Sequence, residues 1–480
     1  MIHPKGLRIL YYSAALLLVL AIIGRIVLGF KYLSVFCDAG YYLSAARQMS
    51  EGARLYTDIK FGYPPVYLAF LSAVVPFAPH HYALWSALHL ILLSATAFLV
   101  FKISRHFTGN SRISAFAAWL YAMTSLIAEG EQVLLETPSC LLGMLALWLL
   151  LQYQRKPVLV LLSGVAAALA MTIKQFGAGF VLLCLLVILL QAIQTRQWRQ
   201  QARILGYFAV GFATTFLFVI WTTPECGELY NPFASYGTDD HARYRYKNIG
   251  ALRFIPGRLK LIALQYMPLI LCIFLPSRIP FRRRLPALGI AVCGFVGFMG
   301  QYYFSNGWHY LLYIAPFGAL LSAVALQNFA GRHRIVQGFL LVAVAVSIFN
   351  LTNASFDCGA WHKQRNSCLI ERHVGKMLQG LPDDSVLLPY NAELFGQYWI
   401  TGKNPPMVEG RYCYSFGPLV LTERLMNEKI RHSEYIIKYN RSTHWEYRQH
   451  ASTERLILSC DTVKSDKNFT LLYNPHCIKP

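Results

Sequence analysis

Long apolar runs with almost no charged side chain are the feature that most constrains how this chain can fold. A water-soluble core does not need such runs, whereas about 20 consecutive apolar residues cross the hydrocarbon core of a bilayer as a helix. Only 14% of the residues are charged, and the mean hydropathy is +0.39. The 480 residues contain eleven candidate segments: 10–30, 83–101, 113–128, 137–151, 158–173, 176–195, 204–222, 259–276, 286–304, 309–328 and 335–351. We therefore expect a polytopic α-helical membrane protein with about eleven transmembrane helices.

The distribution of basic residues predicts which loops face the cytoplasm. The net charge is +21, but the basic residues do not form one patch of the kind that binds nucleic acid. With the N-terminus inside, the cytoplasmic pieces hold 16 Lys and Arg residues and no Asp or Glu: 1–9, 102–112, 152–157, 196–203, 277–285 and 329–334. This asymmetry follows the positive-inside rule. We expect a protein of a bacterial cytoplasmic membrane, with membrane lipids and no nucleic acid as partners.

One apolar segment is too short to span the membrane. Residues 66–78 follow Pro64 and Pro65, and we expect them to form a helix in the membrane interface. Counting them as a crossing would put the cluster Arg282–Arg284 outside and break the charge asymmetry.

The external pieces define the expected domains. The transmembrane domain covers residues 1–351, with external loops at 31–82 and 223–258. Residues 352–480 form a tail in which helical and strand patterns alternate, which predicts a small extracytoplasmic α/β domain. Its predicted helices cover residues 368–381 and 419–431. Its predicted strands cover residues 385–389, 434–439 and 469–473.

Acidic and aromatic residues gather in the first external loop. Asp38 follows the first predicted span, and Asp58 and Tyr63 come later, in Tyr56-Thr57-Asp58 and just before the Pro-Pro pair. A carboxylate at the start of a helix can serve as an N-cap that accepts backbone N–H groups, which is the structural interpretation of Asp38. The functional interpretation is that Asp38 acts as a general base.

Two further external turns carry ionisable residues. Glu136 stands at the external start of the fourth span, in Leu-Leu-Glu136-Thr-Pro, and Lys174 follows the fifth span, in Thr-Ile-Lys174-Gln-Phe-Gly177. A charge at the membrane boundary is costly without a partner or ligand. Lys174 therefore either binds an anionic group or snorkels to the lipid headgroups.

Together these stretches resemble the signature of the GT-C superfamily of membrane glycosyltransferases, such as protein O-mannosyltransferases and the lipid A aminoarabinose transferase. In that superfamily the first external loop carries an Asp, a short helix, a Tyr-x-Asp and a Pro-Pro pair before an interfacial helix. Relatives usually have an Asp at the place of Glu136 and a Thr-Lys-Gly turn at the place of Lys174. The resemblance covers roughly residues 1–200 in motif order. Ala39 follows Asp38 where many relatives have a second carboxylate, so a metal-bridging pair is missing.

The resemblance implies an external active site that transfers a sugar from a polyprenyl-phosphate carrier to a lipid, glycan or protein, with inversion at the sugar carbon. Such a transfer needs a base near the acceptor hydroxyl and cations near the leaving phosphate. Asp38 and Glu136 are the candidate catalytic carboxylates, and Lys174 is the candidate phosphate contact. No zinc-type motif is present, so the sequence does not support a metal site, and a divalent metal stays an open alternative.

Other external residues are candidates for binding the substrate. Glu129 and Glu131 could bind a sugar or a cation, or simply be solvated. Arg243, Arg245 and Arg258 lie among aromatic residues in the loop after residue 222, where they could contact an anionic carrier or form a basic interfacial belt. The aromatic residues beside His309 could stack on a sugar or anchor the chain at the interface. The full set of substrate-binding candidates is Lys174, Asp58, Tyr63, Glu129, Glu131, Arg243, Arg245, Arg258 and His309.

Three other functions stay open at this stage. A flippase or transporter of lipid-linked saccharides is less favoured, because the spans lack repeat symmetry and carry almost no ionisable residue near their middle. An oligosaccharide polymerase or ligase would have similar surroundings but a pyrophosphate-linked donor. A non-catalytic anchor that displays the C-terminal segment is the fourth hypothesis.

Overall fold

The structure is a computed structural model of the whole chain, and it describes part of the residues. Besides the single residues 16, 19, 20, 23, 130, 266 and 349, the described ranges are 37–78, 82–128, 132–152, 156–223, 281–305, 308–327, 342–347, 373–382, 385–390, 405–408, 411–413, 423–440, 451–466 and 469–478. These residues belong to two compact units. Unit 1 contains residues 83–221 and 255–361 with the N-terminal 30 residues, and unit 2 contains 31–82, 222–254 and 362–480.

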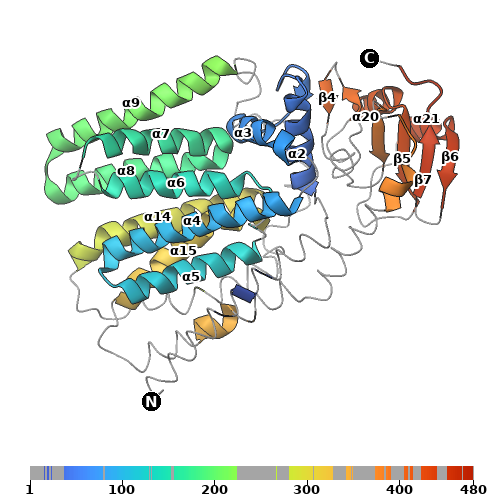
Figure 1. The fold of residues 1–480 in the computed structure, drawn as a ribbon. Helices are drawn as coiled ribbons and strands as arrows, with labels where there is room; N and C mark the ends of the chain where they lie inside the picture. The colour runs from blue at the N-terminus through green and yellow to red at the C-terminus, as the bar shows by residue number, and fades with distance from the viewer. Residues whose placement is uncertain are drawn as a thin grey trace. The chain divides into compact units, whose positions relative to one another are not determined.

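Unit 1 is a bundle of apolar helices that run side by side (Figure 1). Its described elements are α4 (Tyr82–Thr108), α5 (Ser111–Ile127), α6 (Glu136–Leu151), α7 (Val158–Ile173), η2 (Gln175–Gly177), α8 (Ala178–Thr195), α9 (Trp198–Thr222), α14 (Phe281–Ser305), η4 (Trp308–Tyr310) and α15 (Leu311–Gln327). Eight of the eleven segments predicted as spans coincide with these α-helices. The other three, at 10–30, 259–276 and 335–351, lie mostly outside the described residues.

Among the described residues, three helices are long and apolar enough to cross a membrane: Leu84–Thr108, Gln175–Thr195 and Trp198–Thr222. Shorter apolar helices include Glu136–Leu151 and Val158–Ile173. The predicted total of eleven spans stays a prediction, as do the predicted domain limits. Residues 66–78 are predicted as a short interfacial helix, and residues 66–77 of them are helical as α3 (Val66–Val74) and η1 (Val75–Phe77).

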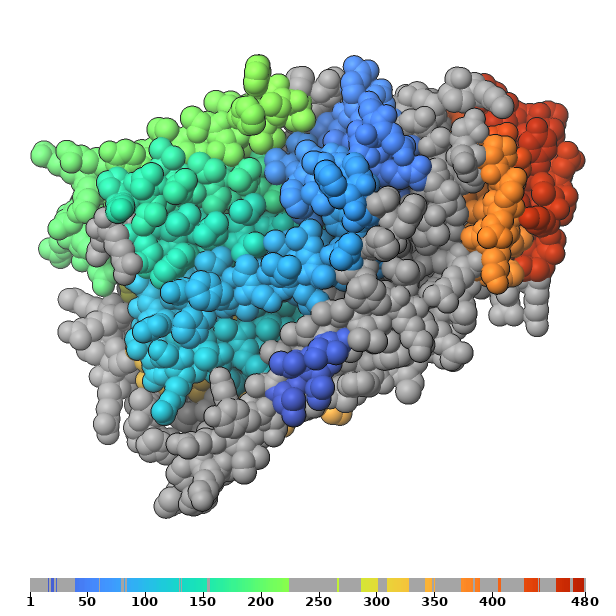
Figure 2. Space-filling view, viewed as in Figure 1, coloured from blue at the N-terminus to red at the C-terminus, as the bar shows by residue number. Residues whose placement is uncertain are grey.

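The helices of unit 1 pack closely where small residues allow it. A Cβ atom at Gly164 of α7 would lie 2.2 Å from the carbonyl oxygen of Phe208 in α9, so only glycine permits this approach of the two backbones. Helix α9, green in Figure 2, also carries exposed large apolar side chains, among them Phe218 and Trp221. An exposed apolar face of this kind is what a membrane-spanning helix presents to lipid.

Unit 2 joins the loop at 31–82, which the sequence predicts to be external, to the C-terminal segment. The loop contains α2 (Cys37–Ser50), which packs against α3, and a short strand β1 (Ile59–Lys60). Strand β1 pairs in parallel with β4 (Arg411–Cys413), which in turn pairs with β3 (Met407–Val408). The chain therefore links two segments about 350 residues apart in sequence through one small sheet.

A second sheet in unit 2 has four strands in the order β2-β5-β7-β6. The strands are β2 (Leu387–Tyr390), β5 (Tyr435–Tyr439), β6 (Asp461–Ser465) and β7 (Phe469–Tyr473). Helices α20 (Glu423–Arg431) and α21 (Ala451–Leu458) complete its described elements. Buried Ile430 of α20 and Ile457 of α21 pack with Leu388, Ile436 and Leu472 of the strands. The three segments that the sequence predicts as strands lie within or across β2, β5 and β7.

Candidate active site

A buried ion pair lies at one end of the helical bundle. The Lys174 ammonium donates a hydrogen bond to Oε1 of Glu136, and the two side chains are 1% and 0% exposed respectively. Removing two charges from water is costly, so a buried pair is weak evidence for stability. Ionisable residues buried among apolar helices instead mark candidate functional sites.

Three helix ends bring the site together. Glu136 is the first residue of α6, Lys174 follows the last residue of α7, and His309 lies in η4 just before α15 begins. The first turns of α6 are tied to both neighbours: Ser139 Oγ donates to the Ala170 carbonyl of α7 at 2.9 Å, and Cys140 Sγ donates to the Leu312 carbonyl of α15 at 3.3 Å. The carboxylate also lies at the positive end of the α6 dipole, which favours its charged form.

A tight turn after α7 holds Lys174 in place. Lys174 leaves the helix with φ −148°, and its carbonyl oxygen accepts a hydrogen bond from the Gly177 N–H at 2.8 Å. A Cβ atom at Gly177 would lie 2.3 Å from the carbonyl oxygen of Ala170, so the turn can fold back on α7 only with glycine at this position. The Thr-Ile-Lys-Gln-Phe-Gly stretch therefore positions the ammonium.

Aromatic rings and an imidazole surround the pair. The Lys174 ammonium lies 4.9 Å from the centre of the Tyr310 ring, and Phe176 packs edge-on against the same ring at 4.6 Å. His309 Nε2 lies 3.4 Å from Oε1 of Glu136, and the His309 side chain is 24% exposed. Glu136, Lys174 and Tyr310 are buried, whereas the His309 side chain is partly exposed.

These positions correct two interpretations from the sequence. Lys174 does not snorkel to the headgroups, because its side chain is buried and paired inside the bundle. Tyr310 likewise is 7% exposed and packs in the core rather than serving as an interfacial anchor. Oε2 of Glu136 is buried and has no hydrogen-bond partner among the described residues. A buried carboxylate oxygen in that state can accept a hydrogen bond from a ligand.

The candidates in the first loop belong to unit 2. Asp58 Oδ2 accepts hydrogen bonds from the Arg54 backbone N–H at 2.7 Å and from the Arg54 Nε at 3.4 Å. These contacts lower the pKa of Asp58, the backbone bond contributing most. Tyr56 adopts a left-handed φ of 67° in this turn, and its hydroxyl donates to the Tyr63 carbonyl at 2.6 Å. The Tyr-Thr-Asp stretch thus builds a turn, and Tyr63 also packs its ring against Tyr42.

The remaining candidates have no described side chain. Asp38 lies in α2, and its side chain is outside the described residues, as are Glu129, Glu131, Arg243, Arg245 and Arg258 as a whole. Across the described ranges, no three His, Cys, Asp or Glu side chains converge in a way that could hold a metal ion. At this site, Glu136 and His309 are two potential ligands that lie together.

Sequence reasoning missed a buried histidine beside the site. His89 of α4 is fully buried, its Nδ1 lies 2.9 Å from the Trp85 carbonyl, and the ring also hydrogen-bonds the backbone of Leu134. Leu134 lies two residues before Glu136, so His89 fixes the loop that leads into α6. A titratable residue within the apolar run 83–101 was the signal, but nothing in the sequence indicated its partner.

Part of this chain matches a known protein family. The family described as dolichyl-phosphate-mannose-protein mannosyltransferase matches residues 53–228, a region that includes Glu136 and Lys174. A sequence comparison with curated proteins gives no match.

Solved structures with the same fold are known. ArnT from Cupriavidus metallidurans bound to undecaprenyl phosphate is similar over 100% of both chains, with a TM-score of 0.60 and 14% sequence identity. Its apo form is similar over 97% of this chain and 99% of that one, again with a TM-score of 0.60 and 14% identity. An oligosaccharyltransferase from Archaeoglobus fulgidus is similar over 89% of this chain and 70% of that one, with a TM-score of 0.50 and 12% identity. The predicted resemblance to the GT-C superfamily of membrane glycosyltransferases is confirmed, and the chain has the fold of that superfamily.

Proposed function

We propose that this protein is a glycosyltransferase that moves a sugar from a polyprenyl-phosphate carrier to a lipid, glycan or protein acceptor on the non-cytoplasmic side of the membrane. The buried Glu136–Lys174 pair with His309 beside it carries the proposal, because it places a fixed cation and a carboxylate at one end of a bundle of apolar helices. The similar ArnT structure contains undecaprenyl phosphate, which supports a carrier of this chemical class.

The chemistry of the transfer assigns two roles to the protein. An oxygen of the acceptor hydroxyl attacks the anomeric carbon of the sugar, and the bond from that carbon to the phosphate oxygen breaks with its electron pair leaving on the phosphate. The hydroxyl proton passes to a base, for which we propose Asp38. Attack opposite the phosphate inverts the anomeric centre.

The leaving phosphate needs positive charge rather than a strong acid. We propose that Lys174 supplies it, with Glu136 holding the ammonium in position and Tyr310 covering one side of it. Charge-assisted hydrogen bonds of this kind are about twice as strong as neutral ones. Oε2 of Glu136 then accepts a hydrogen bond from the sugar or from the acceptor, and His309 lines the exposed side of the cluster.

Two experiments test this proposal. Mass spectrometry of glycolipids and glycoproteins from cells with and without the gene identifies a missing sugar and its acceptor. The purified protein is then reconstituted with the matching polyprenyl-phosphate sugar, and the transferred sugar is quantified. We expect Glu136→Gln to reduce transfer by about tenfold or more, since a carboxylate at the reacting groups is lost. The exposed carboxylate variant Glu51→Gln serves as the matched control and should transfer sugar at the wild-type rate.

The same reconstitution separates the alternatives. A wild-type protein that moves lipid-linked sugar across vesicles and transfers none would identify a flippase. Transfer from a pyrophosphate-linked donor alone would identify a polymerase or ligase. Equal transfer by Glu136→Gln and Glu51→Gln would remove the buried pair from the reaction.

A further inference from the structure

A cavity lies in unit 1 at the opposite end of the helices from the candidate active site. It has a volume of about 500 Å³, within the range of small-molecule sites. Helix α6 connects the two places, since Glu136 is its first residue and Leu151, which lines the cavity, is its last. At 1.5 Å per residue, these residues are about 22 Å apart along the helix. The cavity is therefore separate from the site described above.

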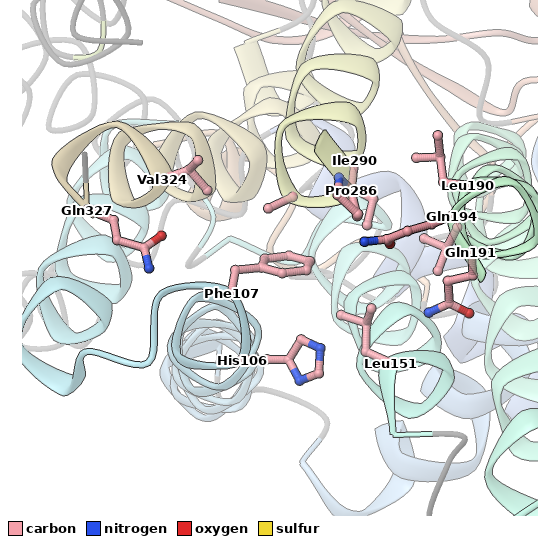
Figure 3. Close-up of a pocket in the computed structure, with 12 residues that line it drawn as sticks. His106, Phe107, Leu151, Leu190, Gln191, Gln194, Pro286, Ile290, Val324 and Gln327 are labelled. Carbon is pink, nitrogen blue, oxygen red and sulfur yellow. The ribbon is translucent and has the colours of Figure 1, made fainter. Parts of the chain in front are cut away.

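The lining changes from apolar to polar toward the helix ends. The side chains around the cavity, drawn in Figure 3, come from α4, α6, α8, α14 and α15. On α8, buried Val187 is followed by Leu190, then by half-buried Gln191 and exposed Gln194. On α15, buried Val324 is followed by half-buried Gln327 in the last turn. Because α4 and α8 are long enough to cross a membrane, their ends lie at the depth of the lipid headgroups. The cavity is thus apolar deep in the bundle and polar at its mouth.

The charges around the cavity distinguish between kinds of headgroup. Four of the five helices, α4, α6, α8 and α15, contribute their carboxyl-terminal ends, which carry partial negative charge. Oε1 of Gln191 is buried and has no hydrogen-bond partner among the described residues. Both features favour a group that donates N–H bonds inside the cavity.

Cations follow the lining residues toward the helix ends. Arg105 precedes His106 in α4, Arg196 comes two residues after Gln194, and both are exposed. The sequence also places Arg282–Arg284 in the first turn of α14, just before Pro286 of the lining. None of the described lining residues is acidic. These arginines favour a ligand whose phosphate lies just outside the cavity and whose N–H donor group lies inside it.

We propose that this cavity binds one phospholipid with an ethanolamine headgroup. The ammonium reaches Gln191, the phosphate lies at the arginine-bearing rim, and an acyl chain contacts the apolar residues deeper in the bundle. Arginine and phosphate form strong charge-assisted hydrogen bonds at such a rim. This inference does not depend on the glycosyl transfer proposed above.

Lipid binding to the purified full-length protein tests the proposal. The protein is stripped of lipid in detergent, and native mass spectrometry then compares binding of three lipids with identical acyl chains: phosphatidylethanolamine, phosphatidylcholine and phosphatidylglycerol. Choline has no N–H donor, so we expect the ethanolamine lipid to bind about tenfold more tightly than the choline lipid, the factor expected of a hydrogen bond to a charged group. Gln191→Leu should abolish this preference, while Gln197→Leu, an exposed glutamine outside the cavity, should keep it.

Several results of this lipid-binding experiment would contradict the proposal. Equal binding of the ethanolamine and choline lipids to the wild-type protein would overturn it, as would an unchanged preference in Gln191→Leu. Tighter binding of the glycerol lipid would show that the cavity selects net negative charge instead. Displacement of the ethanolamine lipid by equimolar polyprenyl phosphate would assign the cavity to the carrier. If Gln191→Leu does not fold, the exposed Gln194→Leu variant, which should weaken the preference, replaces it.

Discussion

Two kinds of ion pair in this chain have the same chemistry and opposite surroundings. In the first loop, Arg47 Nε lies 2.7 Å from Glu51 Oε1, with side chains 27% and 52% exposed. In the bundle, Glu136 and Lys174 are almost completely buried. Exposed pairs contribute about 0–1 kcal/mol, since water screens them and long side chains lose entropy. Breaking a buried pair leaves an uncompensated charge in an apolar environment, which is far more costly.

The comparison separates local structure from function. The loop pairs join residues four positions apart and reinforce a helix or turn that forms anyway. The buried pair joins residues 38 positions apart at the ends of two different helices, α6 and α7. An apolar pair of similar volume could pack there as well. A chain that keeps charges there at such a cost is best explained by a ligand that needs them, which is why the buried pair carries the functional proposal.

The largest effect should come from removing one member of the buried pair. We expect Lys174→Ala to reduce the free energy of unfolding by about 3–5 kcal/mol, because the buried Glu136 loses its ammonium partner and keeps only His309 beside it. The double variant Lys174→Ala/Glu136→Ala should be more stable than the single one, since no isolated charge remains. Denaturant titrations in detergent micelles measure both. Lys156→Ala removes an exposed lysine of the same protein and should change the value by less than about 0.5 kcal/mol. Equal effects of Lys174→Ala and Lys156→Ala would contradict the difference drawn here.

A large effect on turnover without loss of stability is expected at Asp38. Asp38→Asn is nearly isosteric and should keep expression and donor binding, while turnover falls by about 10²-fold, the scale of a lost general base. An N-cap role predicts the reverse, because Asn caps a helix about as well as Asp. Initial rates at saturating donor and acceptor distinguish the two. Near-normal turnover of Asp38→Asn would remove this residue as the base and leave the buried pair as the sole catalytic candidate.

The elements of this fold could be predicted from the sequence where the information is local. Each span is one apolar run, so α4 to α9, α14 and α15 coincide with predicted segments. The partner of Lys174 could not be predicted in this way, because only the packing of α6 on α7 brings it close to Glu136. Strands β1 and β4 have two and three residues, too few for any alternating pattern, so their pairing across the chain left no signal. The turn in the first loop is intermediate: Tyr-Thr-Asp was recognised, but not that its carboxylate is held by Arg54.

A medium effect on stability is expected from changing Tyr310, whose ring covers the buried ammonium of Lys174. Tyr310→Leu should weaken stability by about 2 kcal/mol, since a desolvated cation–π contact is worth about that much. Tyr310→Phe keeps the ring and should lose much less. The chain provides an exposed counterpart, because Lys102 lies 5.1 Å from the ring centre of Phe98, which is 56% exposed. Phe98→Leu should cost about 0.5–1 kcal/mol or less. Unfolding measurements that gave the same loss for Tyr310→Leu and Phe98→Leu would show that burial does not strengthen this contact.

The smallest effect should come from the exposed pair Arg54–Asp58 in the first loop. The way in which its contribution to stability changes with pH shows whether the folded protein favours the charged or the neutral carboxyl group. The Arg54 backbone N–H and guanidinium lower the pKa of Asp58 below its ordinary value of 3.8. A carboxyl group whose pKa is lower in the folded protein adds stability that is complete above the ordinary value. That stability is lost as the pH falls through the lower, folded-state value. Because the group is exposed, we expect less than about 1 kcal/mol.

Comparing the wild type with Asp58→Asn at several pH values measures this contribution. The difference in unfolding free energy should be constant above about pH 5 and shrink toward zero below the ordinary pKa of the carboxyl group, since both side chains are then neutral. High salt should reduce the part that comes from the Arg54 guanidinium and leave the part that comes from its backbone N–H, because screening acts on exposed charges. A difference that grew as the pH fell would mean that the folded protein binds the Asp58 proton more tightly than the unfolded chain does. The turn would then stabilise the neutral acid, and the hydrogen bonds from Arg54 could not be what holds it.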